Sequence, residues 1–483
     1  MNKFICILLT LIVLLSMVAC TSDSPATTGA VDIGTTAAAD GVFMAGYGKA
    51  NITPEEFGVP MQGYSNGEAR RSTGLYSYIY SIALAVRDAQ GNTAIIISVD
   101  SAAVGKHITQ QIHQQIEKKT GVPAENVFIT SIHQHSTPSP DLTEIETSSN
   151  YRALLIKRTV QAAVDAVEDL APAQMYGAVA KTESINFHSH YAVADGTVAG
   201  DNFGDTSAGI VGYAREHDRD MQLVKFIRDG AKDVLIAHYQ GHPAMGTSAW
   251  DTNISADTPG VFRDEMEASG KYLVMYVSGA QGDVSMFTGL TENEIYSDYK
   301  QKGQMLAQYA KEAEGTYKEL KTGKVQVTKM LFAAPVNHAT DYLKDEAEAI
   351  DKEWYRSYNH TSAMAYSTSG EIRSIYQAHA ILLRSKDPAT LGIELMAVSF
   401  GDVAICGGPY EMFDENGQAI KANSPFAFTM PAHMVNDNIG YIPSQAAFDY
   451  TCYQSDICRY AAGTGEMCCD AYIEMLKAQF GAQ

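Results

Sequence analysis

Positively charged side chains are scarce in this chain of 483 residues, which has 35 lysines and arginines against 56 aspartates and glutamates. The formal net charge at pH 7 is therefore −21, with histidine counted as neutral. Proteins that bind nucleic acids or anionic lipid surfaces use a positive patch to attract phosphate groups. The shortage argues against nucleic acid as a partner and against membrane binding through charge.

An apolar run stands at the amino end, in "MNKFICILLTLIVLLSMVAC", and it is too short and too terminal for a spanning helix. A lysine near its start and small residues at its end are typical of a secretory signal. The Ala19–Cys20 junction resembles a bacterial lipoprotein processing site, and the alternative is signal cleavage elsewhere. We expect residues 1–19 to be a signal peptide and the mature protein to be exported, anchored to the outside of a bacterial membrane by a lipid on Cys20.

Internal repeats are absent from the sequence, and only one stretch has the composition of a linker. This stretch, residues 20–41, is rich in serine, threonine, alanine and glycine and has no apolar periodicity. Such a composition is typical of a flexible tether. Since no second linker follows, we expect residues 42–483 to form one large domain.

Cysteines are few, and the paired Cys-x-x-Cys spacing of structural zinc sites is missing from "CYQSDIC" and "CC". Export permits disulfides, so we expect a local disulfide near the carboxyl end in preference to a zinc knot. An odd number of cysteines leaves one thiol over, and the sequence does not fix the pairing. The cysteines of the expected domain are Cys406, Cys452, Cys458, Cys468 and Cys469.

Apolar, β-rich runs alternate with amphipathic stretches along the expected domain. The runs that predict strands are residues 77–88, 92–100, 126–132, 221–229, 233–241, 271–279 and 392–408. The stretches that predict helices are residues 106–121, 151–170, 299–320 and 347–359. Nearly continuous apolar strands interleaved with such helices indicate an α/β fold, with a mixed β-sheet core flanked by helices.

Polar side chains follow several predicted strands, and the carboxyl ends of strands are the usual place for chemistry in such sheets. His133 and His135 are two residues apart, so both imidazoles point to the same side of an extended chain. With His242 and Glu411 they offer the nitrogen and oxygen ligands that a catalytic zinc accepts. A single histidine more often hydrogen-bonds a loop, but the combination favours a metal-dependent hydrolase. The side chains presented at strand ends are Asp100, His133, His135, His242, Asp283, Ser285 and Glu411.

Ten short segments occur in the same order as the signature segments of the neutral, non-lysosomal ceramidase family, which the chain therefore resembles. The resemblance runs from about Ala45 to "RYAAGTGE" and spans essentially the whole expected domain. The segments are "GYGKANITP", "MQGYSNGE", "IIISVD", "ITSIHQHSTPSPD", "DMQLVKFIRDG", "HYQGHPAMG", "SADTPG", "SGAQGDVSM", "GGPYEMF" and "NDNIGYIPSQAAFDY".

The resemblance implies a zinc site with a defined set of ligands. His133 of "HQHS" and His242 of "GHP" take the roles of the two zinc histidines. Glu411 of "PYE" and the phenol oxygen of Tyr441 in "GYIP" complete the implied set. The implied cofactor is therefore Zn²⁺.

The resemblance also implies the residues that act on the substrate. His135 would contact the substrate or the reacting water and serve as general acid or base, since an unshifted imidazole titrates near neutral pH. Ser285 of "GDVS" stands where the family has its essential serine, either as the nucleophile or as a group that orients the substrate. Contacts to the substrate or to the ligands are further expected from Asp100, Gln281 and Asp283.

The reaction implied is hydrolysis of an N-acyl linkage in a ceramide-like lipid, giving a free fatty acid and an amine such as a sphingoid base. The chain departs from the family in three ways. No immunoglobulin-like C-terminal domain is expected, Met286 replaces a proline, and "SINFHSHY" offers Phe187, His188 and His190 in place of an arginine. The alternatives are hydrolysis of another N-acyl lipid, an N-acyl amino acid or an ester, or a non-catalytic surface lipoprotein that binds lipid or glycan.

Overall fold

A computed structural model describes most of the chain beyond residue 40. The described residues are 41–64, 70–142, 144–200, 204–243, 251–287, 298–357, 371–450 and 452–483. The expected signal peptide, Cys20 and nearly all of the expected tether lie outside these ranges. Among the described residues, none of the helices has the length and apolar character that crossing a bilayer requires.

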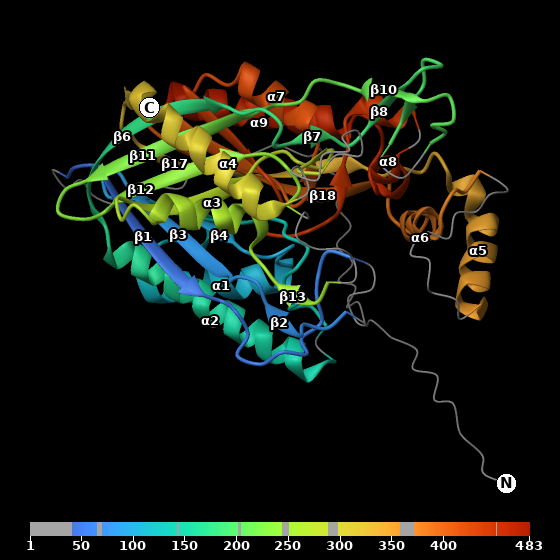
Figure 1. The fold of residues 1–483 in the computed structure, drawn as a ribbon, viewed down its shortest axis with the longest axis horizontal. Helices are drawn as coiled ribbons and strands as arrows, with labels where there is room; N and C mark the ends of the chain where they lie inside the picture. The colour runs from blue at the N-terminus through green and yellow to red at the C-terminus, as the bar shows by residue number, and fades with distance from the viewer. Residues whose placement is uncertain are drawn as a thin grey trace, which may run out of the picture.

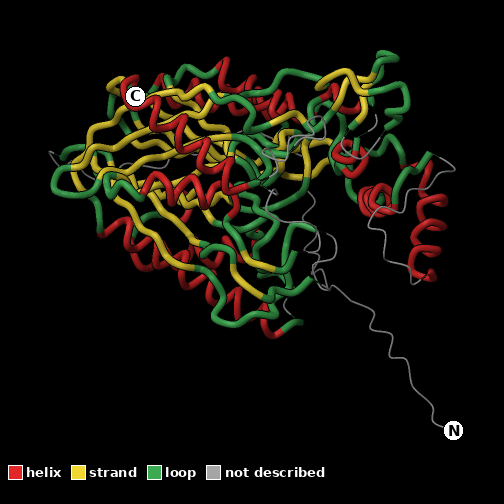
Figure 2. Tube along the Cα trace, in the orientation of Figure 1, coloured by secondary structure: helices red, strands yellow, loops and turns green. Residues whose placement is uncertain are grey.

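A large mixed sheet of nine strands forms the centre of the fold (Figures 1 and 2). The pairs β4–β5 and β12–β14 are parallel, whereas the other neighbours are antiparallel. In spatial order the strands are β14 (Tyr272–Ser278), β12 (Asp233–Tyr239), β11 (Asp220–Arg228), β6 (Ala171–Lys181), β1 (Met44–Asn51), β3 (Tyr80–Arg87), β4 (Thr93–Val99) and β5 (Val127–Ser131), with β16 (Lys318–Leu320) beside β6.

A second sheet packs face to face against the first, and the main core lies between the two. Its strands, in order, are β17 (Val325–Pro335), β18 (Thr390–Phe400), β19 (Val403–Gly407) and β21 (Phe428–Ala432). Side chains alternate along each strand, so Leu84 and Val86 of β3 face the second sheet while Ala83 and Ala85 face the helices. Both sheets are therefore buried on both faces, as a layered α/β fold requires.

Helices cover the two outer faces of this pair of sheets (Figure 1). The large sheet is covered by α1 (Lys106–Thr120), α2 (Glu146–Glu168), α3 (Asp257–Glu267) and α4 (Tyr299–Glu312). The second sheet is covered by α7 (Asp414–Asn423) and α9 (Thr464–Gly481). The remaining helices are α5 (Lys344–Ser357), α6 (Ile375–Arg384) and α8 (Tyr453–Ile457).

Helix α2 lies so close to β1 that two positions of that strand accept only glycine. A Cβ atom at Gly46 or Gly48 would come 2.0 Å from the carbonyl oxygen of Ala166 or Ala162, respectively. The glycines of the segment "GYGKANITP" therefore serve the packing of the helix on the sheet rather than the site.

Short two- and three-stranded ladders decorate the ends of the large strands. Two of them carry candidate site residues: β7 (Phe187–His188) with β15 (Val284–Ser285), and β20 (Glu411–Met412) with β22 (Tyr441–Ile442). In the others, β2 (Gly74–Leu75) pairs with β13 (Asn253–Ile254), and β8 (Tyr191–Val193) lies between β9 (Val198–Ala199) and β10 (Ile210–Tyr213).

The predicted mixed α/β fold with a helix-flanked sheet is confirmed, and each predicted strand and helix has a counterpart. The helix predicted over residues 299–320 was too long. Helix α4 ends at Glu312, a 3₁₀ turn follows at Ala313–Thr316, and residues 318–320 form β16. Gly315 explains the early end, because glycine disfavours continued helix.

The expected disulfide near the carboxyl end was wrong. Cys406, Cys452, Cys458, Cys468 and Cys469 are all free thiols and all buried. Their side chains contribute to apolar clusters around α9 and β19, where cysteine behaves as a small hydrophobic residue. Packing, rather than covalent cross-linking, accounts for the cysteines in this region.

The large sheet curls until its two outer regions meet. Ser98 Oγ of β4 donates a hydrogen bond of 2.6 Å to the carbonyl oxygen of Tyr276 on β14. Ser278 Oγ, at the end of β14, donates one of 3.0 Å to the carbonyl oxygen of Ile132, just after β5. The carboxyl ends of β5, β12 and β14 are thereby gathered at one place.

Candidate metal centre and active site

His133 lies two residues beyond β5 in a strained conformation. Its φ is 63°, in the left-handed region that residues other than glycine rarely adopt. Such strain persists where surrounding contacts enforce it, and it concentrates at functional sites. Here His133 Nδ1–H donates a 2.7 Å hydrogen bond to the carbonyl oxygen of Ala102, which leaves the Nε2 lone pair facing inward.

His242 is held by a loop that follows β12. Its Nδ1–H donates to the carbonyl oxygen of Gln281 at 3.0 Å, so its Nε2 lone pair also faces inward. The Gln281 side chain ties this loop to that of His133, because it accepts from the Gly241 N–H at 3.2 Å and donates to the Ile132 carbonyl at 3.4 Å. Gln281 thus positions both histidine loops.

Glu411 and Tyr441 arrive together on a short parallel ladder, in which they are direct partners. Glu411 is buried, and its Oε2 lies 3.2 Å from His133 Nε2 and 3.6 Å from His242 Nε2. Burial opposes ionisation of Glu411, but the neighbouring His133, with further help from His242 and Tyr441, holds the pKa of the carboxyl below its usual range. Three of the predicted ligands, His133, His242 and Glu411, therefore lie close together, and Tyr441 stands next to Glu411 on the ladder.

The donor atoms suit a metal ion. Glu411 Oε2 is buried and has no hydrogen-bond partner in the described part of the chain. Two imidazole nitrogens and a carboxylate oxygen face one another here, and a cation can bind all three. Imidazole and carboxylate are ligands that zinc accepts. Within the described residues, two groups of side chains could hold an ion, and they share His133. One is His133, His135 and His242, and the other is His133, Glu411 and His433.

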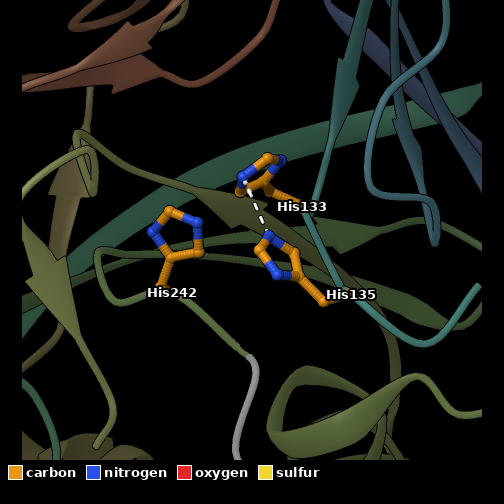
Figure 3. A group of neighbouring side chains, drawn as sticks. All are labelled: His133, His135 and His242. Carbon is orange, nitrogen blue, oxygen red and sulfur yellow. Dashed lines mark hydrogen bonds between the residues drawn. The ribbon is translucent and has the colours of Figure 1, made fainter. Parts of the chain in front are cut away.

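His135 completes the cluster of imidazoles (Figure 3). Its Nε2 lies 3.3 Å from His133 Nε2, and its ring meets those of His133 and His242 edge-on. Desolvation, reinforced by His133, His242 and Arg70, lowers the pKa of His135 well below its usual value. This pKa is lower than that of an unshifted imidazole, and the shift favours the neutral form of His135.

The other side of His135 packs against the segment that contains "MQGY". A Cβ atom on Gly63, whose φ is 96°, would lie 2.4 Å from His135 Cβ, so this approach needs glycine. The Tyr64 ring stands edge-on to the imidazole at 5.1 Å, and the Arg70 guanidinium lies over the Tyr64 ring. Arg70 also donates to the carbonyl oxygen of His135 at 2.6 Å.

Ser285 lies beside the candidate metal ligand His242. It forms an isolated parallel bridge with His242 and pairs with Phe187 across the β7–β15 ladder. Its Oγ accepts a hydrogen bond from the Phe287 N–H at 3.0 Å. The structure thus brings Ser285 to His242, as a shared catalytic site requires.

Asp283, two residues before Ser285, belongs to a buried polar network. It is buried, accepts from the Asp414 N–H at 2.7 Å, and lies 3.4 Å from His188 Nε2. Burial raises the pKa of the Asp283 carboxyl to about 8. His190 continues this buried network through a 2.6 Å hydrogen bond with Tyr450 OH.

Asp100 pairs with a buried arginine. Its two carboxylate oxygens accept from Arg263 NH1 and NH2 at 2.9 and 2.7 Å, and Oδ2 also accepts from the Tyr80 N–H. The pair joins the end of β4 to α3 and thereby stabilises the frame that holds the site.

His433 was missed by sequence reasoning. It directly follows β21, is fully buried, and places its Nε2 3.9 Å from Glu411 Oε2. The signal was present, because the apolar run "FTMPA" ends immediately before it, as other apolar runs end before His133 and His242.

Fold and site together define an α/β protein with a candidate metal centre at gathered strand ends. The family model for the N-terminal domain of neutral/alkaline non-lysosomal ceramidase matches residues 43–316. The chain belongs to this family, which indicates a hydrolase and confirms the resemblance seen in the sequence. A search of curated protein sequences found no match.

Two solved structures have a similar fold. One is a neutral ceramidase from Pseudomonas aeruginosa, with 16% sequence identity and a TM-score of 0.67 over 91% of this chain and 75% of that chain. The other is a ceramidase complexed with C2, with 15% identity and a TM-score of 0.67 over 92% of this chain and 76% of that chain.

The position of Asp100 predicts that Arg263→Met will destabilise the fold. Removing one partner leaves a buried unpaired charge, which costs about 3–5 kcal/mol. Urea denaturation measures the loss. The matched control is Lys181→Met, which removes a largely exposed partner of Asp220 and should cost less than about 1 kcal/mol. Equal, small effects in both variants would contradict the structural role.

Proposed function

We propose that the protein is a zinc-dependent amidohydrolase that cleaves the N-acyl linkage of a ceramide-like lipid, releasing a free fatty acid and an amine such as a sphingoid base. The observation that carries this proposal is the convergence of His133, His242 and Glu411, with separations of 3.2 and 3.6 Å, in a chain of the neutral ceramidase family. Tyr441, paired with Glu411, supplies the fourth ligand.

A zinc ion in this site would lower the pKa of a bound water to about 7 and polarise the carbonyl of the substrate. If zinc were held at His133 Nε2, His135, whose Nε2 lies 3.3 Å from that atom, would be the neighbouring group that exchanges a proton with the reacting water. Because desolvation keeps His135 neutral, its role is to accept a proton from that water and return it to the leaving amine.

Ser285 supplies a hydroxyl next to His242. Because its Oγ accepts the Phe287 N–H, the hydroxyl proton is left to donate to the oxyanion that develops on the acyl carbon. We therefore assign Ser285 to orientation of the substrate and stabilisation of the oxyanion, rather than to nucleophilic attack.

Hydrolysis of another N-acyl lipid, an N-acyl amino acid or an ester is the second candidate, and Phe187 favours it. This ring stands across the ladder from Ser285, at the place of the family's arginine, and is 7% exposed. A buried aromatic ring cannot make the charged contact of a guanidinium, so recognition beside the scissile bond differs. Hydrolysis of a panel of N-acyl lipids and amino acids by the purified protein distinguishes these substrates.

Replacing the metal histidines should remove both zinc and activity. His133→Ala or His242→Ala deletes a ligand from a site of few protein ligands, so zinc measured by elemental analysis should fall to a small fraction of the wild-type content. Tyr441→Phe should lower the zinc content less, since the ring remains. His107→Ala, on the exposed face of α1, is the control. Full zinc occupancy in both histidine variants would sink the assignment.

Replacing the groups that act on the substrate should leave zinc in place. Ser285→Ala and His135→Ala should each lower kcat and kcat/KM together, by roughly 10²-fold or more, because their contacts strengthen in the transition state. Steady-state kinetics and elemental analysis on the same preparations provide the test. A rise in KM with unchanged kcat would instead make either residue a simple substrate-binding group.

We further propose that Cys20 carries the lipid that attaches the protein to the outside of a bacterial membrane, with residues 20–41 as tether and residues 42–483 as the hydrolase domain. The negative net charge supports this arrangement, because attachment then cannot depend on attraction to anionic lipid.

Cys20→Ser should abolish the attachment. The variant should move from the detergent phase to the aqueous phase in a detergent phase separation, since one acyl-bearing residue accounts for the partitioning. Cys6→Ser, within the expected signal peptide, is the control and should behave as wild type. If Cys20→Ser partitions like the wild type, the anchor lies elsewhere.

A further inference from the structure

The environment of His433 differs from that of an ordinary buried histidine. The residue is fully buried, yet neither ring nitrogen has a hydrogen-bond partner among the described residues. A buried polar group left unsatisfied costs about 1–3 kcal/mol. By contrast, His238, also fully buried, has its Nε2 2.9 Å from the carbonyl oxygen of Pro431.

The backbone holds His433 where it is. Its N–H donates to the carbonyl oxygen of Ser278 at 3.2 Å, and its carbonyl oxygen accepts from Thr130 Oγ1 at 2.5 Å. These contacts attach the residue to β14 and to β5, the strand that leads to His133. The imidazole is therefore fixed toward the metal cluster and not toward solvent.

The ring faces the same point as the predicted ligands. His433 Nε2 is 3.9 Å from Glu411 Oε2, and the donor atoms of His133, Glu411 and His433 all lie within 4.8 Å of one another. Ligands on a tetrahedral zinc with bonds of 2.0–2.1 Å stand roughly 3.3 Å apart. The observed spacing is wider than this, so the side chains would move closer together around an ion.

An imidazole binds a metal through the lone pair of a ring nitrogen. Glu411 Oε2, which also lacks a hydrogen-bond partner among the described residues, adds the oxygen donor that zinc accepts beside imidazole.

We propose that His433 is a further ligand of the ion held by His133, His242 and Glu411, so that three imidazoles and one carboxylate contact the metal. This inference rests on the proposed function, since it concerns the same ion. The additional nitrogen donor raises affinity for zinc and cobalt relative to magnesium and calcium, which prefer oxygen. Tyr441 then completes a set of higher coordination number.

The test uses the full-length protein, which is freed of metal with a chelator and then titrated with Zn²⁺ and with Co²⁺. The variants are His433→Ala and His433→Gln. The matched control is His238→Gln, which removes a buried histidine that contacts Pro431 of β21. Readouts are metal affinity by chelator competition and the visible absorption of bound Co²⁺, which reports coordination geometry. Circular dichroism identifies the variants that fold.

Removal of a supporting hydrogen bond costs a metal site about 10–100-fold in affinity. Both His433 variants should lose more zinc affinity than this range, and the cobalt spectrum should change. His238→Gln should keep the affinity and the spectrum of the wild type. An affinity within about tenfold of the wild type, with an unchanged cobalt spectrum in a folded His433 variant, would overturn the inference. Wild-type protein that binds neither metal would instead overturn the proposed function itself.

Discussion

The site depends on the contact between the two outer regions of the large sheet. The hydrogen bonds of Ser98 and Ser278 join the regions of β4–β5 and β14, and the buried pair of Asp100 with Arg263 joins the end of β4 to α3. All these links lie away from water, where unpaired polar groups are costly, so they are satisfied only in one arrangement. That arrangement brings together strand ends that are far apart along the chain.

The gathered strand ends bring several nitrogen and oxygen donor atoms close together. Backbone carbonyl oxygens accept hydrogen bonds from the Nδ1–H groups of His133 and His242, so each ring turns its other nitrogen toward Glu411. Fixing the unused nitrogen in this way orients a metal ligand and raises its basicity. The strain of His133, with its φ of 63°, is the conformational cost of this orientation, and the surrounding strands maintain it.

Much of the frame was predictable because its strands are short, apolar and bounded by turns. The runs ending at Asp100, Ile132 and Gly241 became β4, β5 and β12, and they brought His133 and His242 to one place as expected. Strands β6 and β17 escaped prediction because polar residues interrupt their apolar patterns. The cysteines misled, since composition cannot show whether thiols meet or pack separately. His433 was not found because its partners come from elements distant in sequence.

The candidate metal ligands and the residues expected to touch the substrate depend on different parts of the fold. His133, His242 and His433 follow strands of the two central sheets, so a change that moves them must disturb the core. Ser285 and Phe187 instead share a two-residue ladder at the rim, where a side chain can change without moving a strand. Because His242 bridges directly to Ser285, the hydroxyl keeps its distance from the metal cluster whichever residue stands opposite. Because of this separation, the side chain opposite Ser285 can differ without displacing the candidate metal ligands.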